Sequence, residues 1–172
     1  MEDRIILGIT MGDPASIGPE ITVKALADKA VYQMCRPLVV GDAQVLEAAK
    51  KLVGHEELIV RAVTDVADAA FSYGTTDVLD LGMVSMDKLV RGQISAMCGD
   101  AAFRYVEKVI ELAMNGQVDA TVTNAFNKEA VNLAGHHYSG HTEIYGELTG
   151  TRNYTMMLAH EELRVVHVST HV

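Results

Sequence analysis

Short apolar runs alternate with helix-forming segments along most of this sequence, and this alternation constrains the fold more than any other feature. The first run, residues 4–10, is continuous and rich in β-branched residues, as buried parallel strands are. A glycine-bearing loop and an amphipathic segment, 20–27, follow it. Pro19 suits the first helical position, where its missing N–H costs no hydrogen bond, and Glu20 complements the positive end of the helix. The chain therefore opens with a βα unit.

The same alternation continues to residue 168. Further strands are predicted at 37–41, 58–63, 77–81, 118–123, 154–158 and 163–168, and we expect the last of them to be buried. Helices are predicted at 43–52, 99–115, 128–133 and 141–148, and Asp42 is the expected N-cap of the first of these. Residues 88–97 are charged and weakly patterned, which predicts a loop or an extended arm. Strands alternating with helices predict the α/β class, with a largely parallel sheet flanked by helices.

Composition narrows the functional class. The chain has 172 residues, 49% of them apolar, and no apolar run approaches the roughly 20 residues that span a bilayer. A formal net charge of −9 argues against a nucleic-acid partner, because phosphate contacts need clustered Lys and Arg. The two cysteines, Cys35 and Cys98, have no metal or redox spacing, and no signal peptide opens the sequence. We expect a cytoplasmic protein with two reduced cysteines.

The loop after the first strand, MGDPASIG at residues 11–18, is the first candidate site. It lacks the Gly-Lys-Ser/Thr ending of a Walker loop, and it lacks the third glycine of the dinucleotide fingerprint. Asp13 follows a strand and a glycine, so it is placed to reach a ligand. The alternative is that Gly12, Asp13 and Pro14 form only a tight turn.

A second candidate is TNAFNK at residues 123–128, where a strand ends and a helix begins with Lys128. Free N–H groups and a lysine at a helix N-terminus favour a phosphate or a carboxylate. The alternative is an exposed lysine with Asn127 as an ordinary helix cap.

Histidines concentrate near the end of the chain. Five of the seven lie between His136 and His167, and His171 follows. No pair has the helical spacing flanked by Glu that marks a zinc protease. His141 and Thr142 stand where a helix begins, so their side chains and the free N–H groups are candidates to meet an anion. His171 lies just past a predicted strand end, where a neutral imidazole can bind a divalent metal; the alternative for each histidine is a hydrogen-bonded structural role.

Several of these motifs together resemble the 4-hydroxythreonine-4-phosphate dehydrogenase family. The resemblance is carried, in the family's order, by MGDPASIGPEI at 11–21, Asn127-Lys128, Gly-His-Thr-Glu at 140–143, Met-Met-Leu at 156–158, and Leu-Arg-Val at 163–165 through Ser-Thr-His at 169–171. His141 and Tyr145, followed by Thr-Gly-Thr at 149–151, are more similar to the branch that acts on D-threonate or D-erythronate 4-phosphate.

The resemblance implies a fold similar to isocitrate and isopropylmalate dehydrogenases, with two α/β domains around a cleft. It implies a homodimer that oxidises a 3-hydroxyl with NAD, after which the β-keto acid loses carbon dioxide. The substrates are four-carbon acids with a 4-phosphate, in pyridoxine biosynthesis or sugar acid catabolism. A divalent ion, Zn, Mg, Co, Mn or Ni, holds the substrate oxygens.

The resemblance also assigns roles to particular residues. It implies that His141 and Thr142 bind substrate and that His171 is a metal ligand. Asp13 is a further substrate-binding candidate, and Lys128 is the candidate catalytic acid or base, or a phosphate ligand. No cofactor-binding residue can be named.

This chain departs from the family pattern in three respects. Ser16 stands where the family usually has glycine, and residues 123–126 replace the more usual Thr-x-Pro-Ile/Val. Family members are about twice as long, so the resemblance implies that this chain corresponds to their N-terminal half. We expect a first domain at 1–125 and the start of a second, which lines the cleft, at 126–172. We also expect no turnover by this polypeptide alone, because one of three metal histidines is present.

Two alternatives to a dehydrogenase remain. A phosphate-handling acyltransferase of related architecture would not depend on a metal, so a chelator titration separates it from the dehydrogenase. A non-catalytic fragment would fold without turning over, and the intact mass compared with the gene length would identify it.

Overall fold

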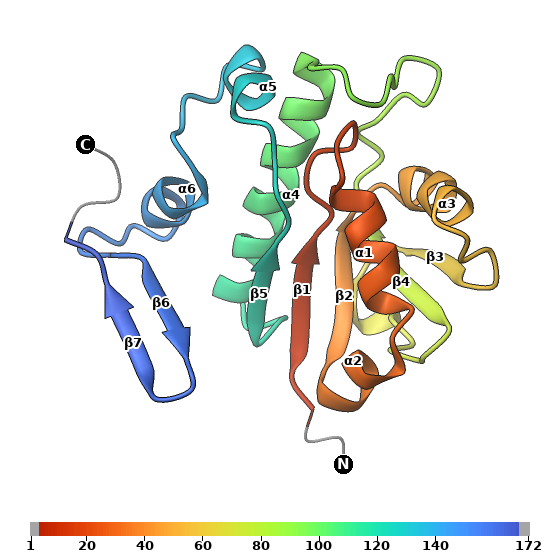
Figure 1. The fold of residues 1–172 in the computed structure, drawn as a ribbon, viewed down its shortest axis with the longest axis horizontal. Coiled ribbons are helices and arrows are strands. Elements are labelled where there is room, and N and C mark those ends of the chain that lie inside the picture. The colour runs from red at the N-terminus through yellow and green to blue at the C-terminus, as the bar shows by residue number, and fades with distance from the viewer. Residues whose placement is uncertain (1–3, 169–172) are drawn as a thin grey trace.

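Five parallel strands form the central sheet of the structure, a computed structural model that describes residues 4–168 (Figure 1). The strands lie in the order β3-β4-β2-β1-β5, and every neighbouring pair is parallel. Their bounds are β1 (Ile6–Thr10), β2 (Arg36–Gly41), β3 (Ile59–Val63), β4 (Thr75–Asp80) and β5 (Ala120–Thr123). The predicted α/β class with a largely parallel sheet is confirmed.

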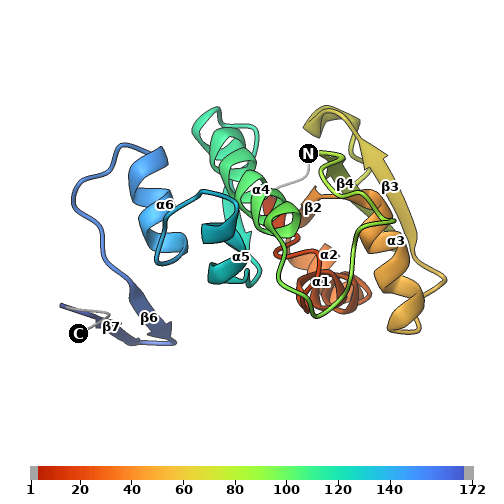
Figure 2. The same ribbon diagram turned by 90° about the horizontal axis from the view of Figure 1, so that it is seen from above.

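Helices cover both faces of this sheet (Figure 2). α4 packs on β1, β2 and β5 from one side, whereas α1, α2 and α3 lie on the other. The bounds are α1 (Gly18–Leu26), α2 (Lys29–Met34), α3 (Ala43–Leu52) and α4 (Ala96–Met114); a short 3₁₀ helix, η1 (Val66–Asp68), lies between β3 and β4. α4 approaches the sheet most closely at Gly8, where a Cβ would lie 2.6 Å from a methyl of Val109.

The helix ends follow local signals in the sequence. α4 begins before the predicted residue 99, because the Ser95 hydroxyl caps it by accepting from the Cys98 N–H at 3.2 Å. Its predicted apolar face is confirmed: Val106 and Ile110 are buried against the sheet. α2 was not predicted, because its six residues make fewer than two helical turns and are too few to show a helical period. Its N-cap, Asp28, accepts from the Ala30 N–H at 2.8 Å.

Asp42 occupies the N-cap position of α3, as predicted, but it does not cap the helix. Its carboxylate instead accepts from the Tyr105 hydroxyl at 2.5 Å and from the Val84 N–H at 2.9 Å. Burial and the neighbouring Asp42 carboxylate raise the pKa of Tyr105. The expected capping bond was therefore wrong, because tertiary partners on α4 and on the loop between β4 and α4 take up the carboxylate oxygens.

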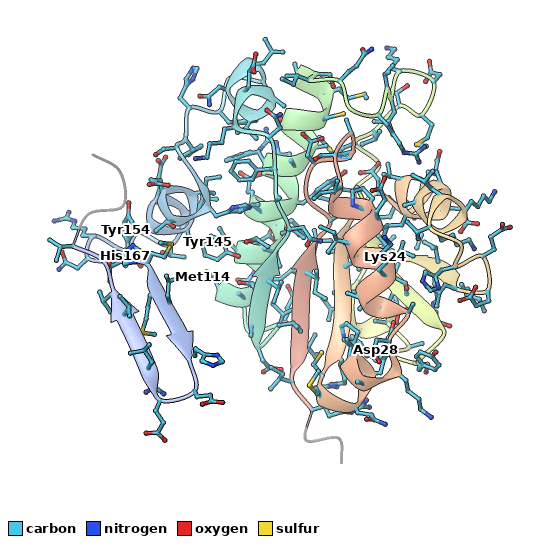
Figure 3. All side chains as sticks on the ribbon, viewed as in Figure 1. Lys24, Asp28, Met114, Tyr145, Tyr154 and His167 are labelled. Atoms are coloured by element: carbon cyan, nitrogen blue, oxygen red, sulfur yellow. The ribbon has the colours of Figure 1, made fainter. Side chains whose placement is uncertain are left out.

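Two short helices, α5 (Lys128–Leu133) and α6 (His141–Leu148), follow β5, both with the bounds that the sequence predicts. α5 lies directly on α4: a Cβ at Gly99 would stand only 1.9 Å from the carbonyl oxygen of Ala130. α6 lies beside the outer strand β5, where the Tyr145 hydroxyl donates to Thr121 Oγ1 at 2.8 Å (Figure 3). Both helices therefore rest on the main sheet layer.

The last two strands, β6 (Met157–His160) and β7 (Leu163–Val166), form an antiparallel hairpin that extends away from the sheet (Figure 1). The prediction that 163–168 is a buried strand was wrong for the described residues: every residue of β6 and β7 is exposed, with Leu163 at 66%. The apolar composition of β7 was read correctly, but nothing within residues 4–168 covers it.

Other expectations from composition can be checked directly. Cys35 and Cys98 are both free and buried, as predicted. Within residues 4–168, none of the helices combines the length and the apolar character of a membrane-spanning segment.

Candidate active site

Three loops meet at the carboxyl edge of the sheet: 11–17 after β1, 81–95 after β4, and 124–127 after β5. The Asp13 N–H donates to the carbonyl of Ala125 at 3.1 Å, and the Gly92 N–H donates to the carbonyl of Ala15 at 2.7 Å. Gly12 is required for this contact, because its φ is +79° and a Cβ would lie 2.5 Å from the Ala125 oxygen. Ligands of open α/β sheets bind beyond the carboxyl ends of the strands, so this junction is the candidate site.

A cavity of about 290 Å³ opens where the loops join. Its polar and charged lining residues are Asp13, Ser16, Glu20, Arg91, Gln93 and Asn127. A larger groove of about 660 Å³ runs between α3 and β3, but it contains none of the residues that the sequence singles out. We therefore place the chemistry at the smaller, more polar cavity.

Asp13 forms part of the cavity wall while its carboxyl group stays almost fully buried, at 3% exposure. The carboxylate accepts from the Ala15 N–H at 2.8 Å and faces the backbone N–H of Asn127. Burial raises the pKa of Asp13, and these two hydrogen bonds oppose the rise. The bond to Ala15 is the turn interaction that the sequence offered as one alternative. The ligand-binding role stays a prediction.

Lys128 opens α5 and is exposed. The Asn127 side chain caps this helix by accepting from the Ala130 N–H at 3.0 Å, so the cap alternative is confirmed. Within residues 4–168 the Lys128 ammonium group has no hydrogen-bond or ion-pair partner, and Lys128 does not line the 290 Å³ cavity. Its catalytic or phosphate-binding role is left as a prediction for a side chain that is free to move.

His141 and Thr142 occupy the first turn of α6, whose N-cap is Gly140 with no side-chain cap. The His141 ring packs against Phe126, with 4.1 Å between the ring centroids, and its Nε2 is buried without a hydrogen-bond partner. Burial lowers the pKa of His141, and a contact with the backbone of Asn124 partly offsets this. At neutral pH the ring is therefore uncharged, which favours a hydroxyl partner over the anion that the sequence suggested.

The loop 124–127 connects these predicted residues. Asp13 contacts it from one side and His141 from the other, and Lys128 follows it directly. Thr142 lies next to His141, but the 290 Å³ cavity is lined by Asp13 and not by Lys128, His141 or Thr142. Within residues 4–168, the four predicted side chains thus lie around one loop but do not together line this cavity.

His171, the predicted metal ligand, lies outside the described residues. Within residues 4–168, no group of three or more His, Cys, Asp or Glu side chains is arranged to hold a metal ion. Asp13 and His141 do not fit a metal site by themselves, since the Asp13 carboxylate is taken up by backbone N–H groups and His141 stands alone. No chemical step is therefore assigned to a metal held by these residues.

Other histidines have structural partners. His136 Nε2 lies 2.7 Å from the Asp100 carboxylate, and the ring stacks on Phe103 with 3.8 Å between centroids. His137 Nδ1 lies 3.3 Å from Asn132 Oδ1. His160 is exposed at the end of β6.

Sequence reasoning gave no individual role to Arg91, Gln93, Asn124 or Phe126. Arg91 and Gln93 lie in the stretch predicted as a loop, and only the fold brings that loop to the cavity. Asn124 and Phe126 had a signal: both fall where this chain departs from the family pattern. Asn124 Nδ2 donates to Thr22 Oγ1 at 2.7 Å, and the Asn124 N–H donates to Thr10 Oγ1 at 3.1 Å.

A parallel sheet with a polar cavity beyond its strand ends is the arrangement typical of α/β proteins that bind small molecules. A family model described as pyridoxal phosphate biosynthetic protein PdxA matches residues 33–172. The chain belongs to the PdxA family.

Individual relatives agree with this assignment. The chain is 47% identical over 167 residues to D-threonate 4-phosphate dehydrogenase of Cupriavidus necator. The aligned stretch covers 97% of this chain and 50% of that protein. It is 45% identical over its full length to a putative D-threonate 4-phosphate dehydrogenase of Symbiobacterium thermophilum. The crystal structure of a 4-hydroxythreonine-4-phosphate dehydrogenase from Burkholderia phymatum superposes with a TM-score of 0.93 at 47% identity, covering 99% of this chain and 51% of that one. The chain thus spans about half the length of the relatives it matches.

Proposed function

We propose that this chain contributes to an NAD-dependent dehydrogenase that oxidises and decarboxylates a four-carbon, 4-phosphorylated 3-hydroxy acid, with D-threonate 4-phosphate favoured. The single observation that carries the proposal is the 47% identity to the Cupriavidus necator enzyme over nearly the whole chain. The similarity to the Burkholderia phymatum structure supports 4-hydroxy-L-threonine 4-phosphate as the second candidate.

The reaction needs a base near the 3-hydroxyl and counter-charges for the carboxylate and the phosphate. NAD, when bound, would supply the acceptor for the hydride on C3. The hydroxyl proton would pass to a base, and the β-keto acid would then release carbon dioxide. An uncharged His141 with an unpaired Nε2 suits a hydrogen bond with a substrate hydroxyl. Lys128 is proposed as the mobile cation that acts as acid, base or phosphate ligand.

The cavity adds two substrate contacts to this scheme. Arg91 is the one basic side chain among the cavity-lining residues, so we propose that it faces the substrate's anionic groups. Asp13 is proposed to accept hydrogen bonds from substrate hydroxyls, in keeping with its position in the cavity wall. Thr142 is proposed as a further hydroxyl contact beside His141.

A divalent ion and the NAD site are proposed for the complete enzyme, with His171 as a ligand of the ion. Such an ion would polarise the hydroxyl and carboxylate oxygens of the substrate. Because the chain spans about half of its relatives, we further propose that the polypeptide alone binds substrate weakly and does not turn over.

The proposed domain division follows the same lines. We keep the sequence boundary near residue 125, with 126–172 as the start of the second domain. α5 packs closely on α4 at Gly99, whereas the hairpin is exposed on all its residues. The hairpin is therefore the part of 126–172 that we propose to lie fully outside the first domain.

We also propose a homodimer in which a second copy covers the hairpin. A two-stranded hairpin is at best marginally stable alone, and apolar side chains occur on both its faces. Leu158 and Val165 pair on one face, and Met157 and Val166 pair on the other. Sedimentation of the wild type against Leu158→Lys tests this: a dimer that the substitution dissociates supports it, and a wild-type monomer contradicts it.

The functional proposal is tested by NADH formation with D-threonate 4-phosphate and a divalent ion. The measurement uses this chain and, in parallel, a version extended to the length of its relatives. We expect activity in the extended protein and none in the 172-residue chain. Robust NADH formation by the 172-residue chain would refute the proposed inactivity. An inactive extended protein that folds and binds NAD would refute the dehydrogenase.

A further inference from the structure

The four residues of the 124–127 loop contact both predicted site residues whose pKa values are shifted. On one side, the Ala125 carbonyl accepts from the Asp13 N–H, and the Asn127 N–H faces the Asp13 carboxylate. On the other side, the Phe126 ring and the Asn124 backbone contact the ring of His141. A displacement of this one loop would therefore change the surroundings of both groups at once.

The side chain of Asn124 fixes this loop to the first helix. Asn124 Nδ2 donates to Thr22 Oγ1 at 2.7 Å, and Thr22 is 3% exposed. The Thr22 hydroxyl in turn donates to the Gly18 carbonyl at 2.9 Å, so its oxygen is left to accept from Asn124. These two hydrogen bonds, from Asn124 to Thr22 and from Thr22 to Gly18, join the β5–α5 loop to the start of α1.

A further hydrogen bond joins the 124–127 loop to the end of β1. The Asn124 N–H donates to Thr10 Oγ1 at 3.1 Å, and Thr10 is fully buried. The strand end thus fixes the loop's backbone, whereas Thr22 fixes its side chain. Buried hydrogen bonds of this kind are costly to leave unmade, so the loop has one favoured position.

We propose that Asn124 is a positioning residue, which through its hydrogen bond to Thr22 holds the 124–127 loop so that Asp13 and His141 keep their places in the site. Asn124 touches neither substrate nor cofactor in this account. The inference rests on the proposed function only in treating Asp13 and His141 as site residues. Its test needs no substrate, so a failure would leave the dehydrogenase proposal standing.

Few charged or titratable groups lie around the Asp13 carboxyl group and the His141 ring. Asp13 helps to raise the pKa of Cys98 on α4, so these two groups are neighbours, and Glu20 and Arg91 line the same cavity as Asp13. For His141, burial lowers the pKa, and the contact with the Asn124 backbone partly offsets this. Loosening the loop would expose both groups to water, so the pKa of His141 should rise and that of Asp13 should fall.

The test measures the titration midpoints of His141 and Asp13 by NMR in the full 172-residue chain. His141→Gln and Asp13→Asn assign the two signals. Thr22→Val removes the acceptor with almost no change in side-chain volume, and we expect the midpoint of His141 to rise and that of Asp13 to fall. Thr22→Ser keeps the hydroxyl and is expected to restore the wild-type midpoints.

A second variant and a matched control make the result decisive. Asn124→Ala removes the donor instead of the acceptor and should shift both midpoints in the same directions as Thr22→Val. Tyr32→Phe removes a different buried hydrogen bond, from the Tyr32 hydroxyl to the Thr75 carbonyl at 3.0 Å, and should leave both midpoints unchanged. The proposal is overturned if Asn124→Ala or a folded Thr22→Val keeps the wild-type midpoints, or if Tyr32→Phe shifts them equally.

Discussion

The central sheet and the β6–β7 hairpin are built from similar residues, yet their environments are opposite. The β2 residues Leu38, Val39 and Val40 are fully buried between helices on both faces of the sheet. Leu158 and Val165, paired on the hairpin, are 56% and 43% exposed. Strand-forming composition therefore predicts a strand in both regions. Only the presence of covering elements decides whether the strand contributes to stability.

This difference shows which parts of residues 4–168 contribute to the stability of the fold. The sheet receives helices on each face from its own crossovers, because parallel strands require long connections. The hairpin is closed by a short turn at Glu161 and Glu162 and receives no such cover within the described residues. We therefore attribute the folding free energy of the described residues to the sheet layer, whereas the hairpin is exposed on all its residues.

The comparison is tested most strongly by making the same substitution in both regions. Leu38→Ala removes a fully buried side chain from β2 and should cost about 2–5 kcal/mol of unfolding free energy. Leu158→Ala on the exposed hairpin should change it by less than about 0.5 kcal/mol in the monomer. Urea denaturation at low protein concentration measures both. Equal losses would mean that the hairpin is covered in solution.

A second pair of variants separates backbone strain from loop contact. Gly12 and Gly54 have nearly the same φ, +79° and +77°, but only Gly12 has neighbours that a Cβ would meet. Gly54→Ala should therefore cost about 1 kcal/mol, and Gly12→Ala about 2–4 kcal/mol because the 124–127 loop must also move. Thermal unfolding compares them. If both lose the same stability, the packing of Gly12 on Ala125 is not tight.

The smallest expected effect is on the pH dependence of the unfolding free energy. His141 has a lowered pKa in the folded chain, so the unfolded chain binds more protons just below its ordinary value of 6.5. The stability that the neutral ring contributes is thus complete above pH ~6.5 and is lost as the pH falls below it toward the folded pKa. His141→Gln should flatten this part of the stability profile, followed by urea denaturation at several pH values. An unchanged slope would contradict the burial of His141.

The sequence predicted the fold where signals were local. The five parallel strands, the bounds of α5 and α6, and the apolar face of α4 were all accessible from periodicity, glycine and capping residues. Burial of β7 and the capping bond of Asp42 were not, because both depend on elements distant in the chain. Tyr105 on α4 takes the Asp42 carboxylate, and no local pattern encodes that contact.

The candidate site shows the same limit. Asp13 and His141 were singled out as candidates because they stand at a strand end and at a helix start, and the family resemblance reinforced this choice. Arg91 reaches the cavity only through the crossover from β4 to α4, and the hydrogen bond from Asn124 to Thr22 joins the loop after β5 to helix α1. The lowered pKa of His141 depends on Phe126, which residue spacing alone did not connect to it.

The central claim is that substrate binds where the three loops meet at the carboxyl edge of the sheet. The most direct test is to titrate the isotope-labelled chain with D-threonate 4-phosphate and to follow its backbone amide shifts in NMR spectra. We predict that the shifts concentrate at residues 12–16, 91–93, 124–128 and 141–142. Shifts confined to the groove between α3 and β3, or no saturable shifts at these loops, would contradict the account.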